Sequence, residues 1–103
     1  MINQKDKKRF RAIGHHLSPI VTIADKGLST RVLAELSRAI TDHELIKIKV
    51  LTGDREERKE TIAQIKQQLE VEIVQSIGKV ALIYKPASSP DPLLSNLLRS
   101  DFF

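Results

Sequence analysis

The strongest constraint on the fold is a repeated switch between helical and strand periodicity along residues 1–85. Three segments carry apolar residues at helical spacing, and a short run with strand character follows each of them. The clearest run, residues 45–51 (Leu-Ile-Lys-Ile-Lys-Val-Leu), puts its β-branched residues on one face and Lys47 with Lys49 on the other. Because an apolar face needs a second layer to cover it, the pattern predicts an α/β fold in the order α-β-α-β-α-β-β.

Local signals indicate where these elements begin. Asn3, Ser29 and Asp54 precede the helical segments and belong to the residue types that accept hydrogen bonds from the first turn of a helix. The predicted strands are residues 20–23, 45–51, 71–77 and 80–84. Gly78-Lys79 separates the last two strands by the spacing of a two-residue hairpin. The chain of 103 residues accommodates one such domain, which we assign to residues 1–85.

Residues 86–103 have a different character. Prolines and serines at the start of this segment predict a stiff, polar linker. The apolar residues that follow it are Leu93, Leu94, Leu97, Leu98, Phe102 and Phe103. The leucines are spaced as one amphipathic turn and a half, which could dock on this domain or on a partner protein. We favour docking on the domain itself, because so short a segment exposes little apolar surface.

The charge of the chain favours a polyanionic partner. Seventeen Lys and Arg against thirteen Asp and Glu give a net charge of +4 and a pI of about 9.6. Near the amino end, basic side chains greatly outnumber acids: Lys5, Lys7, Lys8, Arg9 and Arg11 accompany only Asp6 in residues 1–11. Since Lys and Arg release counterions when they neutralise phosphates, nucleic acid is the leading partner class. The alternative is that the charge serves solubility alone.

Several functional classes are disfavoured by residues that are missing. The chain has no cysteine, which excludes disulfides and thiolate metal sites and favours the reducing cytoplasm. No apolar run is long enough for a membrane span or a signal peptide, so neither insertion nor export is expected. His15, His16 and His43 lack the spacing of metal ligands, so we expect no metal and no cofactor.

The candidate binding site is the loop of residues 24–27, Ala-Asp-Lys-Gly, between a strand and the helix that Ser29 caps. A helix amino terminus attracts anions, Gly27 permits close approach of the backbone, and Lys26 supplies a cation. Strand-to-helix turns that contain glycine are common, so this pattern alone leaves a purely structural loop open. The basic residues expected around it are Lys5, Lys8, Arg11, Arg31, Lys47 and Lys49.

Catalysis is not expected. The chain has no cysteine and no Gly-x-Ser-x-Gly motif, and Ser29 with Thr30 is better explained by helix capping. Glu56, Glu57 and Glu60 share a segment with many basic residues, where ion pairing is the simpler role. A nuclease would need clustered carboxylates for metal ions, and none is evident. The sheet segments contain one aromatic residue, Tyr84, so contact with backbone and shape is expected rather than stacking of bases.

Several residue strings occur along the chain in this order: His15-His16-Leu17-Ser18-Pro19, Lys26-Gly27-Leu28-Ser29, His43-Glu44-Leu45-Ile46-Lys47-Ile48-Lys49, Asp54-Arg55-Glu56, Ile77-Gly78-Lys79 and Tyr84-Lys85. Together they resemble the CRM domain family (chloroplast RNA splicing and ribosome maturation), in particular the stand-alone bacterial YhbY-like proteins. The resemblance implies a two-layer α/β sandwich with a four-stranded mixed sheet, similar to the carboxyl-terminal domain of translation initiation factor 3. It also implies binding to structured ribosomal RNA and a part in assembly of the large subunit.

The family uses a Gly-x-x-Gly loop for RNA, and here Ala24 stands at its first glycine position. Alanine disfavours positive φ, which limits what this position of the loop can adopt. The residues predicted to contact RNA are Ala24, Asp25, Lys26, Gly27, Lys5, Lys8, Arg11, His15, Arg31, Lys47, Lys49 and Arg55. We expect a monomer. The alternative function is a protein–protein adaptor that docks through the apolar tail.

Overall fold

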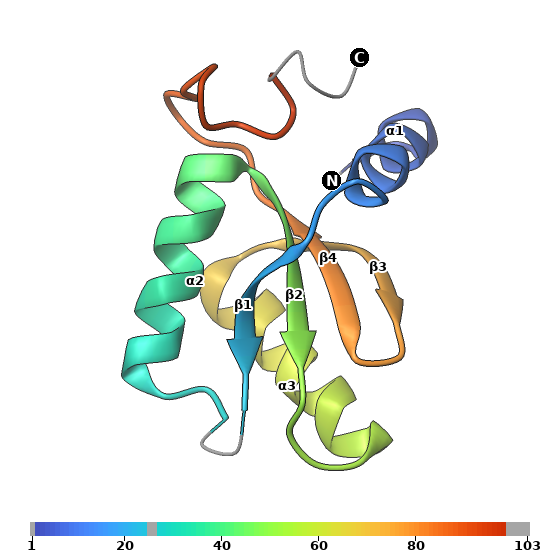
Figure 1. The fold of residues 1–103 in the computed structure, drawn as a ribbon, viewed down its shortest axis with the longest axis vertical. Helices are drawn as coiled ribbons and strands as arrows, with labels where there is room; N and C mark the ends of the chain where they lie inside the picture. Colours follow the sequence, from blue (N-terminus) through green and yellow to red (C-terminus); the bar gives the residue numbers. More distant parts are fainter. Residues whose placement is uncertain (1, 25–26, 99–103) are drawn as a thin grey trace.

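The computed structural model describes residues 2–24 and 27–98. The elements are α1 (Gln4–Gly14), β1 (Pro19–Ile23), α2 (Thr30–His43), β2 (Leu45–Val50), α3 (Arg55–Leu69), β3 (Glu72–Ile77) and β4 (Val80–Tyr84). This is the predicted order (Figure 1). Within the described ranges, no helix has the length and apolar character needed to cross a bilayer.

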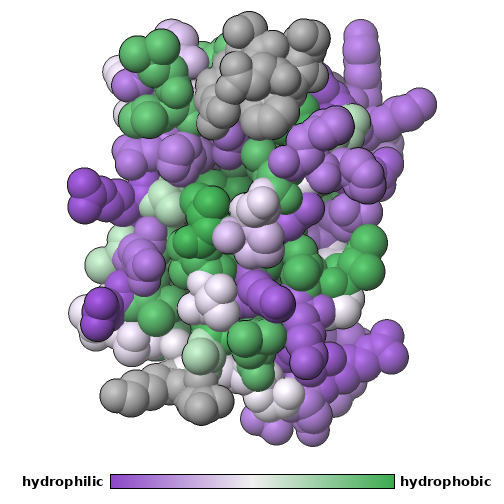
Figure 2. Space-filling view, in the orientation of Figure 1, coloured by the Kyte–Doolittle hydropathy of each residue, from purple (hydrophilic) through white to green (hydrophobic). Residues whose placement is uncertain are grey.

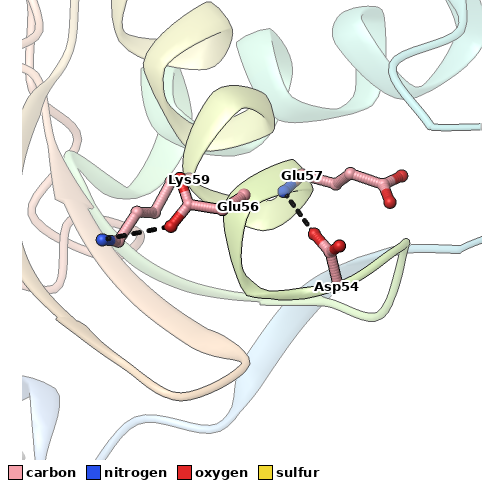
Figure 3. A network of polar contacts seen from close by, with 4 residues as sticks. All are labelled: Asp54, Glu56, Glu57 and Lys59. Carbon is pink, nitrogen blue, oxygen red and sulfur yellow. Dashed lines mark hydrogen bonds and ion pairs between the residues drawn. The ribbon is translucent and has the colours of Figure 1, made fainter.

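All three helices begin at the predicted capping residues. The caps accept backbone N–H bonds as follows: Asn3 from Asp6 at 2.8 Å, Ser29 from Val32 at 3.2 Å, and Asp54 from Glu57 at 2.9 Å. Figure 3 shows the Asp54 cap together with the exposed ion pair between Lys59 and Glu56, 3.9 Å apart. An exposed pair of this kind contributes little to stability, whereas a cap contributes about 1 kcal/mol. The caps therefore define where each helix starts.

The sheet is mixed and has the strand order β1-β2-β4-β3. β1 pairs with β2 in parallel, and β4 runs antiparallel to both β2 and β3. The first three strands therefore point the same way, and β4 is inserted between β2 and β3. Parallel neighbours need a long crossover, which α2 supplies between β1 and β2. The expectation of a four-stranded mixed sheet is confirmed.

The main core lies between the sheet and the pair α2 and α3. It is built from alternate strand residues, such as Ile46 and Ile48, with Leu36, Ile40 and Ile65 from the helices. All five are essentially inaccessible to solvent. Figure 1 shows α2 beside the sheet and α3 passing behind it. These elements form the two expected layers.

The first helix does not belong to those two layers. Phe10 and Ile13 of α1 pack on Leu45 and Leu82, whose side chains lie on the sheet face opposite to α2 and α3. Close approach depends on Gly14, because a Cβ there would lie 2.5 Å and 2.9 Å from the δ carbons of Leu82. The two-layer description therefore needs a correction: α1 adds a partial third layer over one end of the sheet. A helix can pack there because the α1 face of the sheet also carries apolar residues.

The segment after β4 folds back onto the domain, as we favoured, but by means of polar groups. Ser95 and Asn96 are buried, and the Asn96 side-chain amide donates to the Leu45 carbonyl at 2.7 Å. Leu97 is buried beside α1, whereas Leu93 is 84%, Leu94 39% and Leu98 50% exposed. Of the predicted leucine stripe, only Leu97 packs on the domain. Backbone and side-chain hydrogen bonds supply the rest of the docking.

Candidate nucleic-acid interface

One face of the sheet is left largely open, because α1 covers only one end of it. Figure 1 looks onto this face, with α1 at one end of the long axis and the loop after β1 at the other. In the same view, Figure 2 shows hydrophilic surface at α1 and at the lower right, with apolar patches between them and over the middle of the sheet. Any ligand bound here would contact both kinds of surface.

Lys47 and Lys49 lie on this open face, as the alternation in β2 predicts. Their neighbours Ile46, Ile48 and Val50 are buried on the opposite side. Lys49 pairs with Thr22 of β1 in the sheet register, and Thr22 is exposed on the same face. The two lysines therefore form a line that runs along β2 toward the end of β1.

A groove of about 470 Å³ separates the end of α1 from the open sheet face. Arg11 and His15 of α1 line it together with Lys47. Its apolar lining comes from Ile77, Val80 and Leu82 of the β3–β4 hairpin. The structure thus brings three of the predicted contact residues together around one cavity that the sequence did not reveal.

The loop after β1 is described only at its ends. Asp25 and Lys26, both predicted to contact RNA, lie outside the described residues. Gly27 has a φ of +61°, and its N–H donates to the Ala24 carbonyl at 2.8 Å. A Cβ at Gly27 would meet nothing within 4 Å, so the requirement for glycine is the positive φ rather than space. Ala24 occupies the other end of this hydrogen-bonded turn.

Arg31 adjoins that loop. A shallow pocket of about 450 Å³ is lined by residues of the strand end, the loop and the first turn of α2, among them Thr22, Ala24, Gly27, Ser29 and Arg31. Because Thr22 is the sheet neighbour of Lys49, the pocket continues the line of lysines on β2. The exposed residues from α1 to α2 therefore form a strip with basic groups along its length.

The remaining predicted residues are less closely grouped. Lys5 and Lys8 are exposed on α1, at the end of the molecule away from the loop. Arg55 begins α3 and lines a different pocket, with Arg58, Lys59 and Ser76, on the α3 side of the β3–β4 hairpin. Arg55, which the sequence predicted as an RNA contact, therefore lies apart from the other predicted residues on the open face. A single sequence does not reveal this, because it shows the start of α3 but not which side of the sheet that helix covers.

The sequence reasoning also missed Gln75 and Ile77. Both line the groove beside α1 because β3 contains an irregularity between Ile73 and Gln75 that shifts its register against β4. Ile73 packs in the main core, Val74 packs on the α1 side, and Gln75 then pairs with Leu82, which is also on the α1 side. Strict alternation would have placed Gln75 on the α3 side. No signal in one sequence marks such a bulge.

One titratable group near α1 has a shifted pKa. Burial raises the pKa of Tyr84 above its usual value of 10.0, and the nearby carboxylates of Glu44 and Asp6 raise it further. The Tyr84 ring packs on Phe10 with the centroids 4.6 Å apart. Tyr84 is therefore a core-facing residue rather than an open stacking platform for bases.

Among residues 2–24 and 27–98, no three His, Asp or Glu side chains come together in a way that could hold a metal ion. The exposed cations and the two open pockets along the strip suit a large anion instead.

Comparison with known proteins places this arrangement in context. The CRS1/YhbY (CRM) domain family profile matches residues 2–85. A Pseudomonas aeruginosa protein named as a probable RNA-binding protein is 45% identical over 98 residues, covering 95% of this chain and 94% of its own length. A Haemophilus influenzae protein named RNA-binding protein is 37% identical over 86 residues, covering 84% of this chain and 87% of its own.

The fold is also found among solved structures. The solution structure of a hypothetical protein from Staphylococcus aureus superposes with a TM-score of 0.74 at 27% sequence identity. The match covers 86% of this chain and 93% of that one.

Proposed function

The chain belongs to the CRS1/YhbY (CRM) domain family, and we propose from this membership that it binds structured ribosomal RNA during assembly of the large ribosomal subunit. The family is non-catalytic, and no reaction is proposed. The proposal includes the cytoplasmic location that the sequence predicts. The relatives' names support RNA as the ligand.

The observation that carries the proposal is the basic strip on the open face. It begins with Arg11 and His15, continues through Lys47 and Lys49 on β2, and reaches the loop of residues 24–27. Cations spaced along one face can meet successive phosphates of an RNA backbone. The loop is proposed to take one phosphate with Lys26 and Gly27, and Arg31 a neighbouring one. Lys5 and Lys8 extend the contact beyond α1.

Salt dependence of binding tests the strip. Roughly five phosphate contacts correspond to a log–log slope of affinity against salt of about −3.5 to −4.5. The variant Arg31→Gln/Lys49→Gln removes two contacts and is expected to reduce the magnitude of the slope by about 1.4 to 1.8. The matched control is Lys59→Gln/Lys66→Gln, which removes the same charge from exposed positions on α3, behind the sheet. If the salt slope changed equally in both variants, binding would depend on net charge alone, and the strip would not be the RNA-binding surface.

The ribosomal part needs a separate measurement. Full-length protein is mixed with purified large-subunit precursor particles, mature large subunits and mature small subunits, and each mixture is sedimented. We expect cosedimentation with the precursor particles and loss of it in Arg31→Gln/Lys49→Gln. Equal association with all three particles, or with none, would contradict a role in large-subunit assembly while leaving RNA binding intact.

The adaptor alternative relies on the carboxyl-terminal tail, but part of this tail is already packed against the domain. Ser95, Asn96 and Leu97 are buried against the domain itself. The leucines that stay exposed, Leu93, Leu94 and Leu98, are the large apolar side chains of the described tail that a partner could contact without undocking it. We therefore keep RNA binding as the proposed function.

A further inference from the structure

We propose that the groove between α1 and the β3–β4 hairpin holds one unpaired nucleobase of the bound RNA, with Gln75 contacting its edge. The inference rests on the proposed function, because the same strip must first attract the RNA backbone. It adds a ligand feature that the basic residues alone do not specify. Phosphate contacts account for the cations that line this groove but not for its apolar lining from Ile77, Val80 and Leu82.

The size and lining of the groove suit a flat ring with polar edges. Its volume of about 470 Å³ lies within the range of pockets that hold small organic groups. Val80 and Leu82 supply apolar lining, and Ile77 is 66% exposed beside them. An exposed isoleucine on an open sheet face is explained when a base covers it, since an unstacked base also presents apolar surface.

The bulge in β3 is the second observation. It turns both Gln75 and Ile77 onto the α1 side, where they line the groove. Bulges interrupt sheet pairing, and they are found next to binding sites where they redirect side chains. Without the bulge, the polar Gln75 side chain would face the helices α2 and α3. The register shift therefore has a functional consequence: it equips the groove with an uncharged polar group.

The chemistry of Gln75 separates a base from a phosphate. Its carboxamide offers both donors and an acceptor, which match the mixed edges of nucleobases. A phosphate only accepts hydrogen bonds, and the groove already has Arg11, His15 and Lys47 for that purpose. A base inside a duplex has its pairing edge occupied and its faces stacked, so the ligand is an unpaired nucleotide. The cations then hold the phosphates on either side of it.

Two RNA hairpins that differ by one bulged nucleotide provide the test. We expect wild-type protein to prefer the bulged hairpin by about tenfold, which lies within the range of a two-bond side-chain contact with a base edge. Ile77→Ser and Gln75→Ala are each expected to remove most of this preference. Neither variant changes charge, so the salt slope and the affinity for the fully paired hairpin should stay as in wild type.

A matched control and a base series sharpen the result. Leu93→Ser removes a comparable apolar side chain that is 84% exposed outside the groove, and it should leave the preference unchanged. With each of the four bases in the bulge, wild type should discriminate among them, and Gln75→Ala should level the differences. Discrimination that survives in Gln75→Ala would overturn the role of Gln75.

The outcomes distinguish this inference from the proposed function. Equal affinity for both hairpins, with the expected salt slope, would refute the base pocket and leave RNA binding by the strip. Absence of salt-dependent binding to either hairpin and to ribosomal RNA would refute both. Circular dichroism is used to check that each variant is folded. We expect both to fold, because the side chains of Ile77 and Gln75 are exposed.

Discussion

Replacement of Glu44 should show how much the docking of the carboxyl-terminal segment contributes to stability. Glu44 follows α2 with a φ of 61° and is only 6% exposed. Its carboxylate accepts two hydrogen bonds, from the Ser95 hydroxyl at 2.7 Å and from the Ala87 N–H at 2.9 Å. A buried carboxylate with two donors is stable only while both are in place. Glu44 therefore fastens the segment to the end of α2.

The magnitude follows from those two bonds and the backbone. Hydrogen bonds to a charged acceptor contribute about 1.5–3 kcal/mol each, but Glu44→Ala also relieves the cost of burying the carboxylate, and water reaches the freed donors once the segment undocks. We expect a net loss of about 2 kcal/mol. Glu44→Gly loses the same bonds yet removes a positive-φ cost of about 1 kcal/mol. Glycine should therefore be more stable than alanine at this position.

Urea and thermal unfolding of the three proteins measure the effect. A loss of about 2 kcal/mol corresponds to a melting temperature lower by roughly 8–16 °C in a domain of this size. Hydrogen exchange at the amides of Ala87 and Asn96 should accelerate in both variants, since both amides take part in the docking. Unchanged stability of Glu44→Ala would refute the fastening role. Equal stability of the alanine and glycine variants would refute the backbone argument.

Two further predictions concern α1 and its neighbours. The chain has one tyrosine and no tryptophan, so the absorbance of the phenolate reports the ionisation of Tyr84 directly. The midpoint of a pH titration of this absorbance should lie above 10.0 in the native protein and return toward 10.0 in urea. Because the folded state holds the phenol proton more tightly, this contribution to stability is present below pH 10.0 and is lost as the pH rises through the raised pKa. Equal titration midpoints in native and urea-unfolded protein would contradict this prediction. Gly14→Ala should cost about 1 kcal/mol in urea unfolding, because overpacking against Leu82 outweighs the gain in helix propensity, and a stabilised variant would show that α1 can shift freely.

Local chemistry was sufficient to locate the elements. Asn3, Ser29 and Asp54 cap the helices at the positions expected from their residue types. The alternation in β2 correctly placed Lys47 and Lys49 opposite the core. These features depend on neighbours within a few residues, so the sequence contains all the information they need.

The position of the candidate site was only partly predictable. Lys47 and Lys49 were found by periodicity, and the loop at Gly27 by its place before a capped helix. The groove lined by Lys47 and Arg11 could not be found from the sequence, because it exists only where α1 crosses the sheet face. Arg55 was grouped with residues that lie on the other side of the β3–β4 hairpin.

Tertiary structure alone decided the insertion of β4 between β2 and β3, the bulge that turns Gln75 into the groove, and the burial of Glu44. Each depends on groups far apart in the chain: Glu44 is joined to Ser95 across 51 residues, and Gln75 changes face because of its pairing with β4. The sequence by itself determined the helices, the strands and which lysines avoid the core. Which face each helix covers follows from the competition among apolar surfaces for burial, and that competition is settled only when the whole domain packs.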